Sequence, residues 1–339
     1  MKKYCKKVMA FIISTTLLSL SVSFSSFAEK DFSTEDYMHS LAEQTISIVT
    51  ETINNSTQIT YKNIDTFIEK THCLYPAISD LEIAKFVLQY TNQGAENLPD
   101  EIILKAIESK EVTTREDYIA VDASGAQTSL SIQELQQALA TEACEETISP
   151  QDVWISSNGY MKIETVCSFT KKQGEQRYYT VSARAEWLKM PVCFFEDVLA
   201  IAHTGKFDDS YPEFGYKYQD NICCESVYKH NLSTNFPTKD ISFDYPSATG
   251  TALRFKLQAP LNCYKPVIAH IKMAKSISAY LIYGIIVDTP GTLNVKSAYC
   301  HKEVAVGSIG ISCVSGGISF SLSGFKHDYN ARILTVNVT

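Results

Sequence analysis

The chain has 339 residues, with 30 Lys and Arg side chains against 38 Asp and Glu, and a formal net charge of −8. Hydrophobic residues make up 45% and charged residues 20%, which is typical of a globular protein and excludes a disordered one. The net negative charge argues against nucleic-acid binding, which needs clustered Lys and Arg. Ten cysteines are too few for a small disulfide-dense scaffold, and the length suffices for two domains.

The N-terminus has the three parts of a Sec signal peptide. Four lysines lie within the first seven residues, an apolar stretch covers residues 8–22, and Ser26-Phe27-Ala28 supplies small residues for cleavage. We expect residues 1–28 to be removed after Ala28 and the bacterial protein to be secreted, with a retained N-terminal anchor as the alternative. No later apolar stretch approaches the roughly 20 residues of a membrane-spanning helix, so none is expected in the mature chain.

Residues 29–150 are acidic and have the pattern of helices. They carry 22 acidic and 7 basic side chains, and only 2 of the 14 glycines. Ser79 with Glu82, and Ser131 with Glu134, have the spacing of helix capping boxes, each followed by an apolar stripe. We predict an acidic all-helical domain over residues 29–150, with one short strand at Tyr118–Val121 and a junction near Pro150.

Residues 151–339 have the pattern of antiparallel strands, with 16 acidic and 19 basic side chains. Residues 161–169 and 179–187 alternate apolar and polar side chains on either side of Gly174, which predicts a hairpin with one buried and one solvated face. Similar alternation recurs toward the C-terminus. The predicted fold class is therefore α+β: an N-terminal all-helical domain followed by an antiparallel β-sandwich-like domain over residues 151–339.

The sequence lacks the short motifs of the common enzyme classes. It contains no Gly-x-Ser-x-Gly, His-Glu-x-x-His, phosphate-binding loop or dinucleotide-binding glycine pattern. Without Cys-x-x-Cys, the nine cysteines of the mature chain suggest neither a redox site nor a zinc site, and their pairing stays open. Cys300 and His301 are neighbours on a predicted strand, so they point to opposite faces and cannot act on each other. Whether the protein is an enzyme is open, with the balance against it.

Three weaker interpretations concern particular side chains. A hydrolase site could be assembled around His203, Asp197 and Asp208, although a structural role for His203 is more common. Calcium could bind the carboxylates of Asp208, Asp209 and Glu213, although a solvated turn is the commoner explanation for such a cluster. No other cofactor is indicated.

Aromatic side chains suggest a binding surface instead. Trp154 follows the predicted junction and could stack on a glycan, while Tyr211, Tyr216 and Tyr218 lie in one tyrosine-rich segment. The segment 304–322 alternates Ser and Gly with apolar residues around a Ser-Gly-Gly turn, a pattern shared by ordinary hairpins and membrane-inserting ones.

The sequence therefore favours a secreted, non-catalytic binding protein at the bacterial surface or outside the cell. Its partner would be an extracellular protein or a polysaccharide, and its oligomeric state is open. A membrane-active β-hairpin protein is the first alternative, and a secreted hydrolase without a recognisable motif is the second.

Overall fold

The computed structural model describes residues 33–53, 56–93, 98–122, 125–145, 159–189, 195–211, 213–224, 231–235, 241–257, 262–265, 268–303, 307–314, 316–322 and 326–339. Five α-helices and one 3-10 helix lie in these ranges: α2 (Thr34–Thr45), α3 (Ile64–Leu74), α4 (Asp80–Tyr90), α5 (Asp100–Ile103), η1 (Leu104–Glu108) and α6 (Ile132–Glu145). The strands are β1 (Ser47–Ile53), β2 (Ser56–Lys62), β3 (Glu111–Val121), β4 (Gln127–Leu130), β5 (Gly159–Gln173), β6 (Gln176–Trp187), β7 (Glu196–His203), β8 (Lys206–Phe207), β9 (Phe214–Cys224), β10 (Asn231–Asn235), β11 (Ile241–Ser247), β12 (Gly250–Lys256), β13 (Asn262–Lys265), β14 (Ile268–Val287), β15 (Gly291–Lys302), β16 (Gly310–Val314), β17 (Gly317–Ser321), β18 (Lys326–Asn330) and β19 (Leu334–Val338).

Contacts divide the chain into two compact units, residues 1–44 and Thr45–Thr339. Within the described part of the first unit, α2 begins after Ser33, whose Oγ accepts a hydrogen bond from the Asp36 backbone N–H at 3.2 Å. The Asp36 carboxylate accepts in return from the Ser33 N–H at 3.0 Å. This reciprocal pair satisfies donors that a helix start would otherwise leave without partners.

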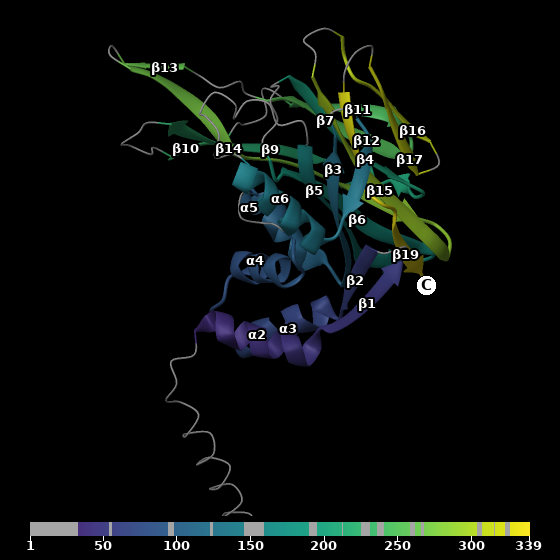
Figure 1. The fold of residues 1–339 in the computed structure, drawn as a ribbon. Helices are drawn as coiled ribbons and strands as arrows, with labels where there is room; N and C mark the ends of the chain where they lie inside the picture. Colours follow the sequence, from purple (N-terminus) through teal and green to yellow (C-terminus); the bar gives the residue numbers. More distant parts are fainter. Residues whose placement is uncertain are drawn as a thin grey trace, which may run out of the picture. The chain divides into compact units, whose positions relative to one another are not determined.

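The second unit is built on an antiparallel sheet whose strand order is β1-β2-β3-β5-β6-β14-β9-β10, with β4, β8 and β13 paired alongside (Figure 1). The predicted all-helical N-terminal domain is wrong, because residues 47–130 supply β1 to β4 of this sheet. β3 and β5 pair along their length, from Glu111 opposite Phe169 to Val121 opposite Gly159. Strands from both predicted regions therefore share one hydrogen-bonded sheet.

Local helix signals in this region were nevertheless read correctly. Ser79 and Glu82 form the predicted capping box of α4, with the Glu82 N–H 3.3 Å from Ser79 Oγ and the Ser79 N–H 2.9 Å from Glu82 Oε2. Ser131 and Glu134 form the same pair of bonds at the start of α6. Capping depends on residues three apart in the sequence, so it can be recognised without knowledge of the tertiary fold.

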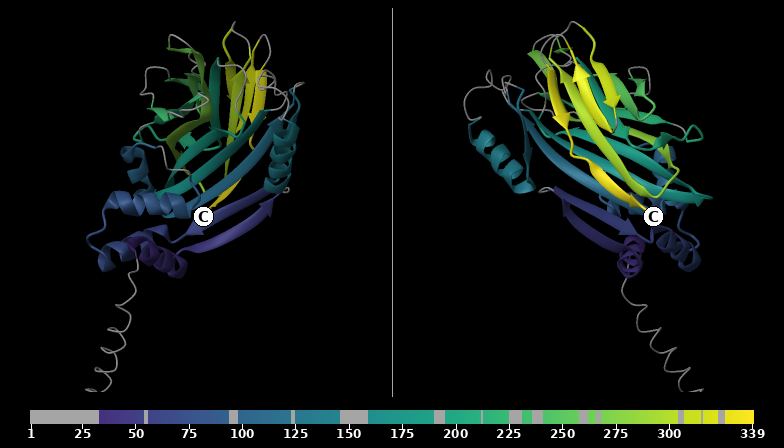
Figure 2. Two further views of the ribbon diagram at one scale, coloured as in Figure 1. Left: turned by 60° about the vertical axis from the view of Figure 1, so that its left-hand side comes forward. Right: turned by 90° about the vertical axis from the view of Figure 1, so that its right-hand side faces the viewer.

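A second sheet, of order β11-β12-β7-β15-β18 with β19 on β15, packs on one face of the large sheet. The right-hand view of Figure 2 shows the yellow C-terminal strands in front of the teal strands of the large sheet. The core between the sheets contains side chains from both, and its members include the following: Ile163, Val181, Ala183, Trp187, Leu199, Leu253, Leu281, Val295 and Tyr299. The described residues thus bear out a β-rich, antiparallel and sandwich-like body.

The opposite face of the large sheet is also partly covered, which corrects the expected solvated face. Glu164, Ser168 and Ser182 lie on the face that was predicted to be solvated, and all three side chains are buried. On the same side, Ile102 of α5 packs against Tyr280 and Ile282 of β14. Alternation along a strand identified the two faces correctly, but helices from a distant part of the chain decide how much water reaches them.

The predicted hairpin in 304–322 forms a small sheet of β16 and β17, outside the second sheet. Cys313, Ile318 and Phe320 are buried in a cluster with small residues of β7, β12 and β15, such as Ala200 and Ala298. Ser312, Ser319 and Ser321 face solvent. The apolar face of the described hairpin residues is therefore packed against the protein itself.

Helices that could cross a membrane do not occur in the described ranges, since none is both long and apolar enough.

Candidate functional site

Four of the side chains singled out in the sequence line one pocket of about 590 Å³. Asp208, Asp209, Tyr211 and Glu213 follow β8. The rest of the lining comes from strands of the large sheet and of the second sheet. The complete lining is Phe207, Asp208, Asp209, Tyr211, Glu213, Phe243, Tyr245, Tyr283 and Gly284. We call this the acidic aromatic pocket.

A tight turn after β8 holds the acidic wall in place. Phe207 pairs with Ile285 of β14, and the Asp208 N–H then donates to the Gly284 carbonyl at 3.0 Å. The Asp208 carboxylate accepts from both the N–H and the hydroxyl of Ser210, a local bond typical of Asp in turns. The backbone contacts of Phe207 and Asp208 therefore hold this turn against β14.

Gly284 makes this arrangement possible. A Cβ added at Gly284 would lie 2.5 Å from the Cβ of Tyr211 and 3.0 Å from the Cβ of Asp208. Real Cβ atoms do not approach so closely, so any larger residue would push the turn away from β14. The glycine in the otherwise apolar run of β14 is thus required by the close approach of the turn.

The opposite wall is aromatic and comes from β11. Tyr245 donates its hydroxyl to Glu213 Oε2, and this hydrogen bond raises the pKa of Tyr245 to about 12. Phe207 contacts Tyr245 edge-on, with ring centroids 6.5 Å apart, and Tyr283 at 5.2 Å. Burial raises the pKa of Tyr211 and of Tyr283, so all three tyrosines that line the pocket stay neutral at physiological pH.

The other tyrosines proposed as a binding surface lie elsewhere. Tyr216 packs on the cluster formed by Ile102 and Tyr280, on the helix-covered face of the large sheet. Tyr218 is half-buried on β9. Trp154 lies outside the described residues. Of the three aromatic candidates in the described ranges, Tyr211 lines the acidic aromatic pocket and the other two do not.

The three candidates for a hydrolase site are not brought together. Asp197 and His203 occupy one face of β7 but are six residues apart, a separation of about 20 Å along a strand. His203 is buried behind the pocket, with its ring centroid 5.3 Å from that of Phe207 and 5.6 Å from that of Tyr283. Burial lowers its pKa to about 4, so the imidazole is neutral at pH 7.

Asp197 belongs to a separate buried network in the core. It lies opposite His301 on β15, and its Oδ1 is 2.8 Å from His301 Nδ1. Tyr299 donates its hydroxyl to Asp197, and Trp187 Nε1 donates to the Tyr299 oxygen at 3.1 Å. Cys300, between Tyr299 and His301, is buried on the other face of β15, as the strand parity predicted.

Metal binding gains no geometric support in the described residues, since no group of three or more His, Cys, Asp and Glu side chains there could hold an ion. Of the three calcium candidates, Asp208 bonds Ser210 and Glu213 accepts the Tyr245 hydroxyl. These carboxylates share a pocket wall without converging on one point.

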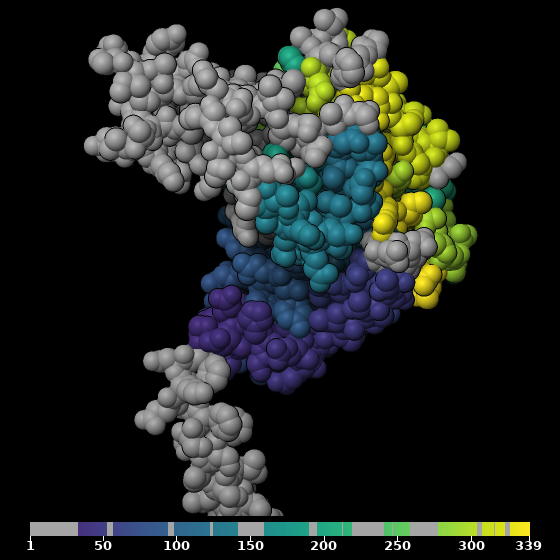
Figure 3. Space-filling model, viewed as in Figure 1, coloured from purple at the N-terminus to yellow at the C-terminus, as the bar shows by residue number. Residues whose placement is uncertain are grey.

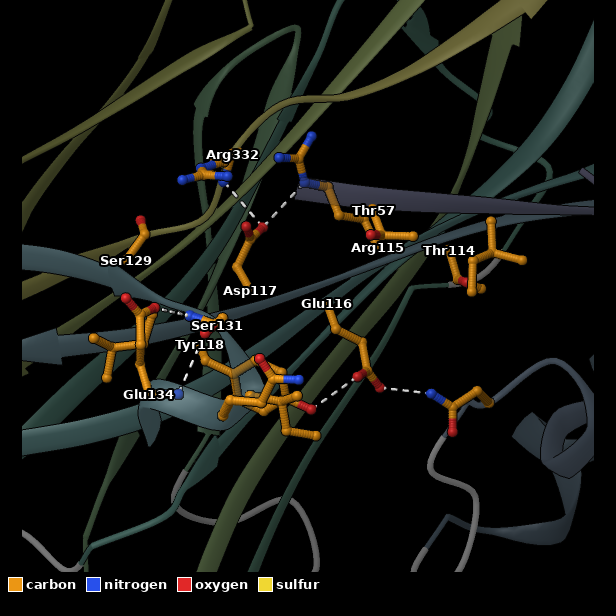
Figure 4. Close-up of a pocket in the computed structure, with 15 residues that line it drawn as sticks. Thr57, Thr114, Arg115, Glu116, Asp117, Tyr118, Ser129, Ser131, Glu134 and Arg332 are labelled. Atoms are coloured by element: carbon orange, nitrogen blue, oxygen red, sulfur yellow. Dashed lines mark hydrogen bonds and ion pairs between the residues drawn. The ribbon is translucent and has the colours of Figure 1, made fainter. Parts of the chain in front are cut away.

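A second pocket, of about 620 Å³, contains a buried ion pair (Figure 4). Arg115 Nε and Asp117 Oδ2, both from β3, are 3.3 Å apart, and both side chains are at most 5% exposed. Arg115 also donates to the Ile333 carbonyl at 2.6 Å, while the Arg332 N–H donates to Asp117 at 3.1 Å. The pair thus binds the backbone between β18 and β19.

Side chains of the neighbouring strands β2 and β4 also bind the C-terminal backbone around residues 330–335. Gln58 of β2 accepts from the Thr335 N–H at 3.1 Å and donates to its carbonyl at 2.7 Å. Gln127 of β4 accepts from the Asn330 N–H and donates to the Asn330 carbonyl. Side chains of β2 to β4 therefore satisfy the backbone of residues 330–335, and we assign the buried charges of this pocket a structural role.

Three cysteines in the described ranges lie in the core. Cys167, Cys300 and Cys313 are buried and free, while Cys73 is free and exposed. Burial raises the pKa of Cys313 to about 11, so its thiolate is scarce at neutral pH.

Comparison with known proteins identifies no family: no family model matches the chain, and no curated protein sequence matches it. Similar solved structures include AvmM, described as catalysing macrocyclization in alchivemycin A biosynthesis, at 9% identity over 44% of this chain and 79% of that one, with a TM-score of 0.17. Another is a manganese lipoxygenase of Gaeumannomyces graminis, described together with part of a zonadhesin of Komagataella pastoris, at 8% identity over 68% and 91%, with a TM-score of 0.20. Scores this low say nothing about the function of this chain.

Proposed function

We propose that this is a secreted, non-catalytic binding protein whose acidic aromatic pocket recognises an organic cation, such as a basic side chain of an extracellular protein. The observation that carries the proposal is the lining of the pocket. Asp208, Asp209 and Glu213 supply three carboxylates, and no lining residue is basic.

The charge of the pocket favours a positively charged guest. Lys206 adjoins the pocket in the sequence but forms an ion pair with Asp288, outside the lining. Lys105, which approaches Tyr211 at the border of the pocket, likewise forms an ion pair with Glu108 outside the lining. Carboxylates in a concave site whose lining has no basic residue create a negative potential there, which raises the local concentration of cations. An anionic or purely apolar ligand would gain nothing from this arrangement.

The aromatic wall favours an organic cation over a bare metal ion. Rings within about 6 Å of an ammonium group attract it through the negative face of the π-system, worth about 0.5–1 kcal/mol at exposed sites. The chain already shows such a contact at the border of the pocket, since Lys105 Nζ lies 5.3 Å from the centre of the Tyr211 ring. Tyr245 and Phe207 offer further rings to a guest.

The chemistry of the lining favours binding over catalysis. Tyr211 and Tyr245 are held neutral, and the nearest imidazole considered for catalysis, His203, lies behind the wall with its Nδ1 bonded to the Gly205 carbonyl at 3.1 Å. The hydroxyl–carboxylate pair in the lining, Tyr245 and Glu213, has its tyrosine pKa raised to about 12, which makes this hydroxyl a poor nucleophile at neutral pH.

Two matched small molecules test the proposal. Choline carries a trimethylammonium group, and 3,3-dimethyl-1-butanol has the same shape without the charge. Titrations followed by ligand-observed NMR should show binding of choline and much weaker binding of the alcohol. Equal binding of both, or binding of neither up to about 50 mM, a dissociation constant near the limit of specific recognition, would contradict the proposal.

Single substitutions in the lining, together with a control outside it, locate the binding site. Asp209→Asn and Tyr245→Leu should each weaken choline binding by about two- to fivefold, the loss expected for one exposed charge or ring. Asp288→Asn is the matched control, because it removes one negative charge that does not line the pocket. If Asp288→Asn weakens binding as much as Asp209→Asn does, the interaction reflects overall charge and the pocket is not the site.

A further inference from the structure

β1 is the edge strand of the large sheet. It pairs with β2 from Ser47 opposite Lys62 to Ile53 opposite Ser56, and no described strand pairs with its other side. In Figures 1 and 2 no described strand lies beyond β1 at that edge. A row of backbone N–H and C=O groups therefore faces outward along this strand.

The strand carries few of the features that usually protect such an edge. Each residue from Ser47 to Thr52 is exposed, including Ile48 at 52% and Val49 at 40%. The segment Ser47–Ile53 has no Lys, no Pro and no bulge against β2, and Glu51 is its single charged residue. In the space-filling view, the β1–β2 hairpin forms part of the open surface (Figure 3). An exposed strand of β-branched residues is a template for a further strand.

The register identifies which backbone groups are available. Two residues separate the closing pair, Ile53 and Ser56, and such a pair exchanges both of its backbone hydrogen bonds. Hydrogen-bonded and non-hydrogen-bonded pairs then alternate along the ladder. Ile48, Thr50 and Thr52 consequently direct their N–H and C=O groups away from β2, toward solvent.

We propose that β1 is a dimerisation edge, at which two copies of this chain pair antiparallel about a two-fold axis at Thr50. Thr50 then lies opposite Thr50 of the partner subunit and exchanges both backbone hydrogen bonds with it. Ile48 lies opposite Thr52 of the partner subunit, which places β-branched side chains together. The large sheet of one subunit and that of its partner then form one continuous sheet.

A second copy fits this edge because the strand complements itself. In the register centred on Thr50, Glu51 lies opposite Val49 of the partner subunit, so no like charges meet directly. Moving the centre to Glu51 would place the two carboxylates opposite each other, which is destabilising. Two-fold pairing also uses both β1 edges at once, so assembly stops at the dimer instead of continuing as a fibre. Because only one short strand per subunit is involved, the dissociation constant should be on the order of 10–100 µM.

The test is a proline at the centre of the edge. Thr50→Pro removes an N–H that faces the partner, and edge positions with solvent-facing N–H groups tolerate proline. Sedimentation velocity from about 5 to about 200 µM, a range that brackets the expected constant, should show a monomer–dimer equilibrium for the wild type and a monomer throughout for the variant. Val49→Pro, which removes an N–H bonded to β2, should instead lower the unfolding temperature.

Hydrogen exchange gives a readout that does not depend on either variant folding. The amides of Ile48, Thr50 and Thr52 should exchange more slowly in the concentrated wild-type protein than in the dilute one. A wild type that stays monomeric across the range would overturn the proposal. So would a dimer in which these three amides show no protection, or one that persists in Thr50→Pro.

Discussion

Replacing His203 with asparagine should make the stability of the protein less sensitive to acid. His203 is fully buried, and its Nδ1 carries the proton because its partner, the Gly205 carbonyl, can only accept. Nε2 is then the site that must be protonated, and it is buried without a hydrogen-bond partner. Asn Nδ2 can replace the Nδ1 donor without introducing a titratable group.

The size of the effect follows from the shift in pKa. Burial lowers the pKa of His203 from 6.5 to about 4, so the unfolded chain binds a proton at a higher pH than the folded protein. The stability contributed by the neutral imidazole is therefore complete above pH 6.5 and is lost progressively as the pH falls toward 4. At about 1.36 kcal/mol per pKa unit, the loss is about 2 kcal/mol at pH 5 and about 3 kcal/mol at pH 4.

Urea unfolding of both proteins at several pH values measures this loss. The variant should be less stable than the wild type at neutral pH, by about 1–3 kcal/mol for the changed packing, and the gap should close or reverse near pH 4. Carboxylates titrate in both proteins, so their contribution cancels in the comparison. Parallel curves of stability against pH for the two proteins would refute the assignment of a low pKa to His203.

Two substitutions and one labelling experiment test the packing. Arg115→Met should cost about 3–5 kcal/mol in urea unfolding, because the buried Asp117 carboxylate then loses its ion-pair partner. Gly250→Ala should cost about 1–3 kcal/mol, because its Cβ would lie 2.5 Å from the Cβ of Cys313 beneath the β16–β17 hairpin. A maleimide should label Cys73 in the native protein and Cys313 only after unfolding, as peptide mapping would show. Losses under about 1 kcal/mol, or native labelling of Cys313, would contradict the described packing.

Patterns that depend on near neighbours could be predicted from the sequence, and patterns that depend on distant pairing could not. The strands around Gly174 were predicted because alternation persists over nine residues on each side. Ile48 and Val49 lie in the region that was predicted to be all-helical. Their β-branched neighbours in Ser47–Ile53 favour a strand, but pairing with β2 and β3 decides the outcome.

The candidate site shows the same division. Asp208, Asp209, Tyr211 and Glu213 could be grouped from the sequence because they fall within six consecutive residues. The aromatic wall of the pocket was not predicted, because Tyr245 lies 32 residues after Glu213 in the sequence, on a strand of the second sheet. Its signal was the alternation of Ile241, Phe243 and Tyr245, which predicts a strand face but not what that face meets.

Buried polar groups in this protein were the least predictable feature, and their partners explain why. Asp117 and Arg115 bind backbone groups of residues 332 and 333, and Asp197 binds Tyr299 and His301. Each partner is 100 or more residues away in the sequence, so no local sequence pattern predicts these contacts. A buried charge with such a partner has a structural role. A ligand that bound this charge would first have to break its hydrogen bond or ion pair within the protein and then replace it. Among the described residues, the carboxylates of the acidic aromatic pocket are accessible to a guest and the outward backbone of β1 has no described strand beside it. Recognition is therefore best sought at these two places.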